Sequence, residues 1–355
     1  MGADATLLQK GIRQAALSLC LGVAVLSGCR HVPEHAATAP ARDMVPSRAL
    51  ALADEILAAT PEDGELYDKA TLARMQSATD KLAALGEGAA PALDRLLHVM
   101  LDRSLDRKRA EADSSILFSI LGRFTFPHLQ WKPGSSIGGE FFLKSCELWM
   151  YGYDAKAVRH PWLRPFILKA LSHGFLLPRN EPWVMWALEC HSANLAADLV
   201  ALSKAAPRPK VRALSLQYLS SLSPLPRAQL ADALVWCMDC DNNCRPLTMA
   251  IALSIRFKVK SALPSLAVLA DSTDQADRYA VQNFVAKRFL GNPAKALAWG
   301  FVPTMGDLAV FAYQEISGKD LGFTNWQDSR EKMPEIIRKL RADPRWKVRI
   351  IHGRL

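Results

Sequence analysis

Three consecutive segments of the chain repeat one pattern, and this repeat limits the fold more than any other sequence feature. Segments 194–223, 229–260 and 261–291 each contain two stretches with apolar residues at helical spacing, joined by a short polar turn. An arginine follows each turn, and Arg212, Arg245 and Arg278 lie 33 residues apart. Stacked helix pairs have such a period, because one pair cannot bury its apolar stripe alone. We therefore expect an all-α fold, an α-solenoid of stacked antiparallel helix pairs.

An earlier segment, 82–122, carries the same pattern with an Ala-Pro-Ala-Leu motif at Ala90–Leu93 and Arg109 after a polar turn. It resembles a HEAT repeat of the short bacterial kind, similar to the repeats of phycobilisome-lyase-type proteins. Ser261–Leu266 resembles the first helix of that repeat. The resemblance implies a HEAT-like solenoid over residues 48–355 and no enzymatic activity, because such repeats serve as scaffolds in many settings.

The N-terminus has the layout of a secretory signal. Lys10 and Arg13 precede an apolar run that ends in Leu26-Ser27-Gly28-Cys29. This ending resembles the lipobox of bacterial lipoproteins, which implies cleavage before Cys29 and lipidation of its thiol. In the alternative, an ordinary signal peptide, Cys29 is incidental. We expect a signal peptide over 1–28, a flexible tether over 29–47, and a lipoprotein on the periplasmic face of the envelope, at the outer membrane because Arg30 follows the cysteine.

The charge is strongly basic, with 44 Lys and Arg against 35 Asp and Glu. Residues 327–355 hold much of the excess. Because an exported protein does not normally meet nucleic acid, anionic lipid head groups or an acidic protein are better partners. The alternative is a solvated helix face before a frayed terminus.

Aromatic residues are dense in segment 124–166, which we interpret as an irregular insertion. Trp131, Trp149 and Trp162 are candidates for stacking on a glycan or anchoring a peptide, as in an envelope enzyme or glycan-binding protein acting on peptidoglycan. In the alternative they fill the core. The Gly134–Gly138 loop matches a nucleophile-elbow pattern around Ser136, but this chemistry needs a strand before the loop and the sequence predicts no sheet.

The cysteines after the lipobox offer a further candidate site. Cys237, Cys240 and Cys244 cluster, and Cys190 precedes a histidine. We expect disulfides or a buried thiol, because an oxidising compartment favours disulfides and Cys237 falls on an apolar stripe. A metal-binding protein using this cluster is the alternative, but a second Cys-x-x-Cys is missing. No cofactor and no metal are predicted.

The function that we predict is a lipid-anchored envelope scaffold without catalytic activity, binding an unknown envelope protein or peptide. The arginines at the 33-residue period form a ladder that could grip acidic groups. In the alternative they are structural, each pairing with an Asp or Glu of its own turn or with neighbouring helix carbonyls, as Asp274 and Asp277 beside Arg278 suggest.

Overall fold

The structure, a computed structural model, describes residues 44–60, 69–103, 107–128, 157–172, 181–285, 289–290 and 303–344. These residues form helices and their connections. The only β-pairing among them is an isolated bridge between Gln275 and Thr304. In this described part no helix is both long and apolar enough to cross a membrane. The predicted all-α class is confirmed.

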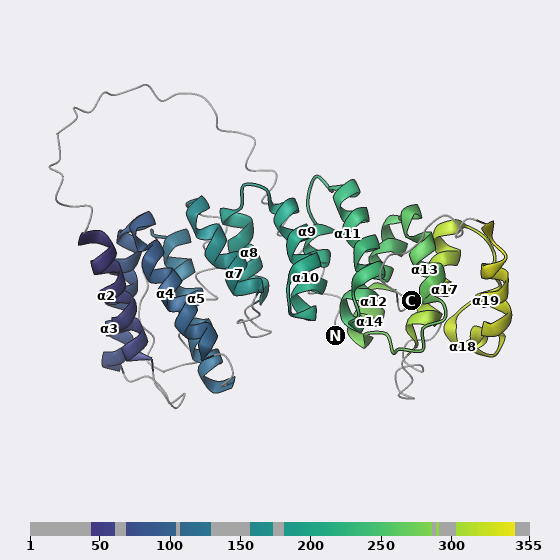
Figure 1. The fold of residues 1–355 in the computed structure, drawn as a ribbon, viewed down its shortest axis with the longest axis horizontal. Helices are drawn as coiled ribbons and strands as arrows, with labels where there is room; N and C mark the ends of the chain where they lie inside the picture. Colours follow the sequence, from purple (N-terminus) through teal and green to yellow (C-terminus); the bar gives the residue numbers. More distant parts are fainter. Residues whose placement is uncertain are drawn as a thin grey trace, which may run out of the picture.

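The helices follow one another as pairs along the long axis of the molecule (Figure 1). The first helices of the pairs are α2 (Met44–Ala59), α4 (Ala90–Asp102), α7 (Arg164–Ser172), α9 (Leu195–Ala205), α11 (Arg227–Cys240) and α13 (Leu263–Leu269). The second helices are α3 (Lys69–Ala84), α5 (Arg107–Thr125), α8 (Glu181–His191), α10 (Pro209–Leu219), α12 (Cys244–Phe257) and α14 (Arg278–Phe284). The chain continues with α17 (Met305–Ser317), α18 (Trp326–Ser329) and α19 (Met333–Arg341).

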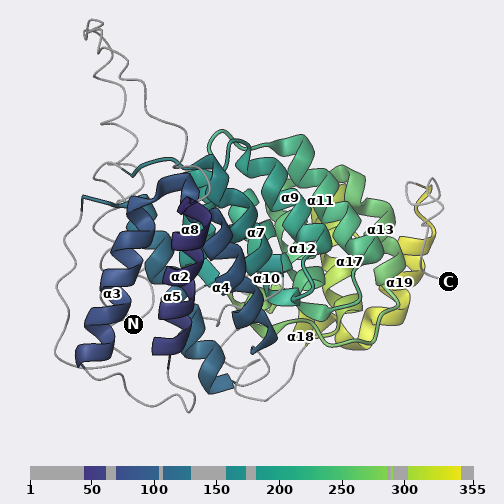
Figure 2. The ribbon, with the colours of Figure 1, turned by 60° about the vertical axis from the view of Figure 1, so that its left-hand side comes forward.

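Contacts between neighbouring pairs establish two layers. The first helices pack in succession, α2 on α4, α4 on α7, α7 on α9, α9 on α11 and α11 on α13. In the other layer α3 packs on α5, α5 on α8, α10 on α12, and α12 on both α14 and α17. Figure 2 shows α9, α11 and α13 in one row and α10, α12 and α17 in the row beside it. This succession of nearest-neighbour contacts is the arrangement of an α-solenoid.

The predicted repeats correspond to helix pairs, with two corrections at their boundaries. Segment 82–122 contains the end of α3 before the pair α4 and α5, because Gly86 takes a left-handed φ of 56° and breaks the helix there. Helix α2 begins at Met44, so the last residues of the predicted tether are helical. Pro46 lies in the first turn of α2, where a missing N–H costs nothing.

Proline marks the start of several first-layer helices. A 3-10 turn leads into each of α4, α7, α13 and α19, and the second residue of each helix is a proline: Pro91, Pro165, Pro264 and Pro334. Proline suits this position because its φ is already helical and the N–H that it lacks would have no partner in the helix.

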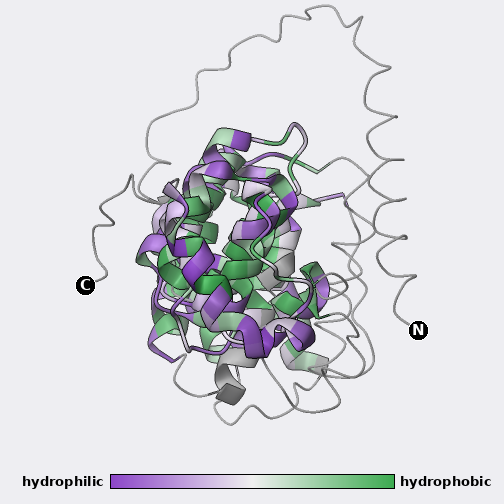
Figure 3. Ribbon diagram, turned by 90° about the vertical axis from the view of Figure 1, so that its right-hand side faces the viewer, coloured by the Kyte–Doolittle hydropathy of each residue, from purple (hydrophilic) through white to green (hydrophobic). Residues whose placement is uncertain are grey.

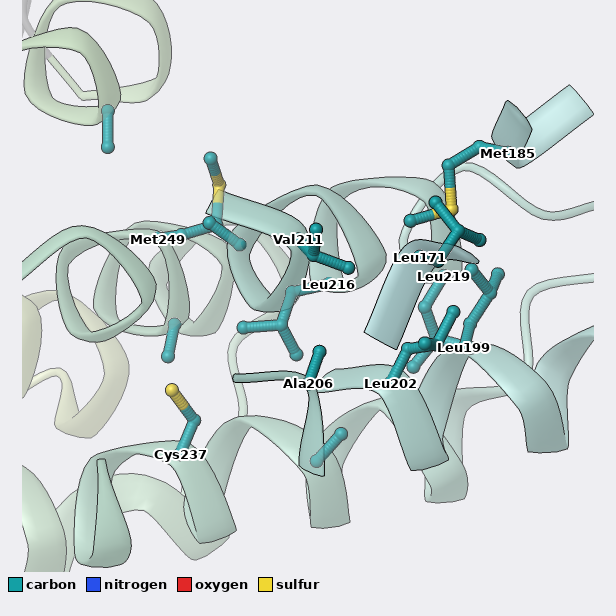
Figure 4. Packing of buried hydrophobic residues seen from close by; sticks show 14 of the residues in the cluster. Leu171, Met185, Leu199, Leu202, Ala206, Val211, Leu216, Leu219, Cys237 and Met249 are labelled. Carbon is teal, nitrogen blue, oxygen red and sulfur yellow. The ribbon is translucent and has the colours of Figure 1, made fainter. Parts of the chain in front are cut away.

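The core lies between the two layers and continues through the stack. Figure 3, a view along the stack, shows the hydrophobic ribbon toward the interior and hydrophilic ribbon toward the periphery. In the middle of the stack Leu202 of α9, Leu216 of α10 and Met249 of α12 are buried (Figure 4). Each buried leucine or methionine of this kind contributes about 2 kcal/mol by leaving water.

The last helix pair closes the stack through a polar turn. The Gln314 side chain accepts hydrogen bonds from the N–H groups of Leu321 and Phe323 and donates to the Phe323 carbonyl. Gly318 ends α17 with a φ of 70°. Helix α19 then buries Ile336 and Leu340 and turns its charged residues outward. A polar outer face of this kind is what a terminal repeat needs.

Gly306 allows α17 to approach the backbone of the turn after α13 very closely. Its N–H donates to the Ser272 carbonyl at 3.1 Å, and a Cβ built there would lie 2.7 Å from the carbonyl oxygens of both Ala270 and Ser272. We expect Gly306→Ala to lower the free energy of unfolding by about 2 kcal/mol, because the extra methyl must push two backbone segments apart.

Urea denaturation tests the sign of this effect. In an open helix, replacing glycine by alanine stabilises by about 1 kcal/mol. If the Gly306→Ala variant unfolds at the same or a higher urea concentration than the parent protein, the close approach of α17 to the turn after α13 does not require glycine at this position.

Candidate binding surface

Three arginine–aspartate pairs join successive helix pairs in the middle of the stack. Arg164 of α7 bonds to Asp198 of α9, Arg212 of α10 to Asp241 after α11, and Arg245 of α12 to Asp277 before α14. Burial alone would raise the pKa of Asp198, but hydrogen bonds from Arg164 and Ser192 outweigh it and lower that pKa. The aspartate partner of each arginine therefore lies across the repeat boundary and not in the arginine's own turn.

All three guanidinium nitrogens of Arg212 are bonded within the protein. Nε and Nη2 of Arg212 donate to the two carboxylate oxygens of Asp241 at 2.6 and 2.9 Å. Nη1 donates to the carbonyls of Ala206 and Pro207 at 2.7 and 3.0 Å. The side chains are only 15% and 3% exposed. Of the two predicted roles, ligand binding and structural pairing, Arg212 has the structural one.

Arg245 is held much less tightly. Its Nε donates to Asp277 at 3.2 Å, and its side chain is 39% exposed. No other hydrogen bond of its guanidinium is found among the described residues. The expectation that Asp277 pairs with Arg278 is wrong. Asp277 pairs with Arg245 instead, and its side chain caps α14 by accepting a hydrogen bond from the Ala280 N–H. Arg278 is exposed and forms no ion pair within the described segments.

A groove opens beside Arg245 on the layer of second helices. It has a volume of about 330 Å³. Ala213, Leu214 and Met249 form an apolar floor from α10 and α12, and the polar rim consists of Lys210, Gln217, Arg245, Asp277 and Tyr279. Tyr279 is 56% exposed, more than any other large hydrophobic side chain in the described ranges. An apolar floor with a few polar groups at its rim is the usual composition of a binding groove.

The described part of the aromatic segment packs into the core. Phe124 and Phe126 are buried. Trp162 is half-buried and meets the Phe124 ring edge-on, with ring centroids 5.1 Å apart. Phe124 belongs to α5 and Phe166 to α7, so both ends of segment 124–166 are regular helices and not an insertion. Trp131, Trp149 and the loop around Ser136 lie outside the described residues.

The four described cysteines of the candidate site are free thiols, so the disulfide expectation is not met for Cys190, Cys237, Cys240 and Cys244. Cys237 and Cys240 share α11; Cys237 points into the core (Figure 4), whereas Cys240, the last residue of the helix, is exposed. The buried-thiol alternative describes Cys237. Among the described residues no three His, Cys, Asp or Glu side chains are grouped to hold a metal ion.

His191 is a buried titratable group that was not predicted from the sequence. It is 2% exposed at the end of α8. Its Nδ1 accepts the His160 N–H at 3.0 Å, so the proton of the neutral ring is on Nε2, which donates to Thr125 Oγ1 at 2.8 Å. Burial, with His160 and Arg159 nearby, lowers the pKa of His191 to about 4. Burial also raises the pKa of the adjacent Cys190 thiol to about 11, which makes it a poor nucleophile.

Comparison of the chain with protein-family models, curated proteins and solved structures gives no match.

Proposed function

We propose that the protein is a lipid-anchored scaffold of the cell envelope that binds a segment of another protein and has no catalytic activity. The observation that carries this proposal is the groove between α10, α12 and the start of α14, with Arg245 only partly satisfied and Tyr279 exposed. An exposed tyrosine beside an arginine is the composition typical of energetically important positions in interfaces.

The groove suits an acidic group beside an apolar side chain. Leu214 and Met249 provide apolar contact, and flexible methionine adapts to different partner shapes. The terminal nitrogens of Arg245 can donate a bidentate pair of hydrogen bonds to a carboxylate. The one acidic residue at the rim, Asp277, is already bonded to Arg245 and to the Ala280 N–H. We infer that the ligand is a peptide segment with an aspartate, a glutamate or a C-terminal carboxylate.

Capture from crosslinked cell envelopes tests this function. The double variant Tyr279→Ala/Arg245→Gln should lose the partner that the parent protein captures, because it removes the exposed ring and the available guanidinium. Leu50→Ala/Arg74→Gln is the matched control, since it removes an exposed apolar side chain and an exposed arginine far along the stack. Equal capture by parent, groove variant and control would refute the proposal for this groove.

Anchoring is proposed to depend on Cys29 alone. In cells carrying Cys29→Ala, we expect the protein to move from the membrane pellet to the soluble fraction, because one lipid-bearing residue provides the whole of the hydrophobic attachment. Cys20→Ala, which lies in the apolar run before the lipobox, is the control and should leave the protein in the pellet. The anchor is elsewhere if the Cys29→Ala protein still pellets and resists a salt wash.

No specific observation in the described residues favours the alternatives of an envelope enzyme, a glycan-binding protein or a metal-binding protein.

A further inference from the structure

A second cavity lies at the edge of the stack, between the pair α11 and α12 and the link to α13. It has a volume of about 490 Å³. One wall comes from the loop before α11 and the first turn of that helix, and the other from the end of α12 and the link to α13. We call it the edge cavity. Its lining residues differ from those of the groove beside Arg245, so the two sites can be tested separately.

The edge cavity is surrounded by positive charge. Arg227, Arg256, Lys258 and Lys260 line it, and no carboxylate does. Lys258 bonds to the Glu315 carboxylate at 3.2 Å, and Arg256 lies 5.4 Å from the centre of the Phe257 ring. Arg227, Arg256 and Lys260 form no ion pair with another described residue. Three uncompensated cations around one hollow repel each other, and an anion between them relieves that repulsion.

Apart from Ser261, the remaining lining is apolar. Leu225, Leu230, Ala231, Phe257 and Val259 contribute it, and Leu230 and Val259 are buried. A ligand that fills the hollow therefore needs a carbon-rich part beside its anionic group. The total charge of three such cations is larger than a carboxylate, with its single negative charge, can balance. A phosphate monoester carries close to two negative charges at neutral pH and balances more of it. Arginine and lysine together are also common phosphate ligands in proteins.

We propose that the edge cavity binds a phosphate group attached to an apolar moiety. Two sources share this chemistry, the head group of an anionic phospholipid and a soluble phosphate ester. The cavity is a site distinct from the groove that carries the proposed function, and it does not require that function to be correct.

Calorimetric titration of the purified full chain in a neutral detergent tests the proposal. The probes are detergent-dispersed phosphatidic acid and soluble phenyl phosphate, with phosphatidylcholine and benzoate as controls for the head-group charge and for a carboxylate. We expect phosphatidic acid to bind and phosphatidylcholine not to bind. In Arg227→Gln/Lys260→Gln the affinity should fall about tenfold or more, as expected for the loss of two charge-assisted contacts.

Arg48→Gln/Lys81→Gln is the matched control, since it removes the same charge from exposed positions outside the cavity. Phenyl phosphate binding as tightly as the lipid would support the phosphate site and identify the soluble source. Stronger binding of phosphatidic acid would support the lipid source. Three results would overturn the proposal: benzoate binding as well as phenyl phosphate, equal weakening by the two double variants, and no binding of either phosphate probe to a chain with native circular dichroism.

Discussion

Replacing Arg212 by methionine should lower the free energy of unfolding by about 3 kcal/mol, the usual cost of leaving one member of a buried ion pair alone. Methionine keeps most of the side-chain volume but removes the donors to Asp241 and to the carbonyls of Ala206 and Pro207. Asp241, only 3% exposed, would then hold a buried charge without its counter-ion.

Two further variants separate this explanation from a general packing defect. Arg245→Met should cost about 1 kcal/mol, because the Arg245–Asp277 bond is single, longer and more exposed. Arg212→Met/Asp241→Asn should recover part of the loss, since the uncompensated charge is gone while the new amide oxygen can still accept the Asn243 N–H. Urea denaturation at neutral pH measures all three. Equal losses for Arg212→Met and Arg245→Met would contradict a structural role specific to Arg212.

Acidification should destabilise the stack through His191. In the unfolded chain this histidine has an ordinary pKa of 6.5, whereas in the folded chain its pKa is about 4. The unfolded state therefore binds the proton first as the pH falls. Stability from this group is fully present above pH 6.5 and is lost as the pH falls to about 4, for a total of about 3 kcal/mol. The main physical reason is burial of the ring, which disfavours its charged form, with His160 and Arg159 nearby adding to it. In addition, Nδ1 accepts the His160 N–H and cannot take a proton without breaking that bond.

The variant His191→Gln provides the comparison. It should be less stable than the parent protein at neutral pH, because glutamine cannot bond to both the His160 N–H and Thr125 with the geometry of the ring. Its stability should change much less between neutral pH and pH 5 than that of the parent. If both proteins lose the same free energy over this range, the pH dependence comes from other groups.

The repeat period and the succession of helix pairs could be predicted from local patterns. Apolar spacing and proline positions such as Pro91 and Pro264 depend on residues close in sequence. The partners of the arginines could not be predicted from neighbouring residues, because Asp241 and Asp277 follow Arg212 and Arg245 by nearly one repeat. A search for acidic residues one period downstream of each arginine would have found them.

The histidine site and the state of the cysteines depend on contacts that local patterns do not encode. His191 meets Thr125, which is 66 residues away, because α8 packs on α5. The spacing of Cys237 and Cys240 suggested a bond, but Cys237 is buried in the core and Cys240 is exposed at the end of the same helix.

Site-specific photocrosslinking at Tyr279 tests the central proposal, that the groove on the second helices is the partner-binding surface. A benzophenone amino acid placed at position 279 in the full chain should give a crosslinked adduct in living cells, and the adduct should weaken when Arg245→Gln is added. The same group at position 50, another exposed apolar site, should give none. No adduct at position 279, or equal adducts at both positions, would contradict the proposal.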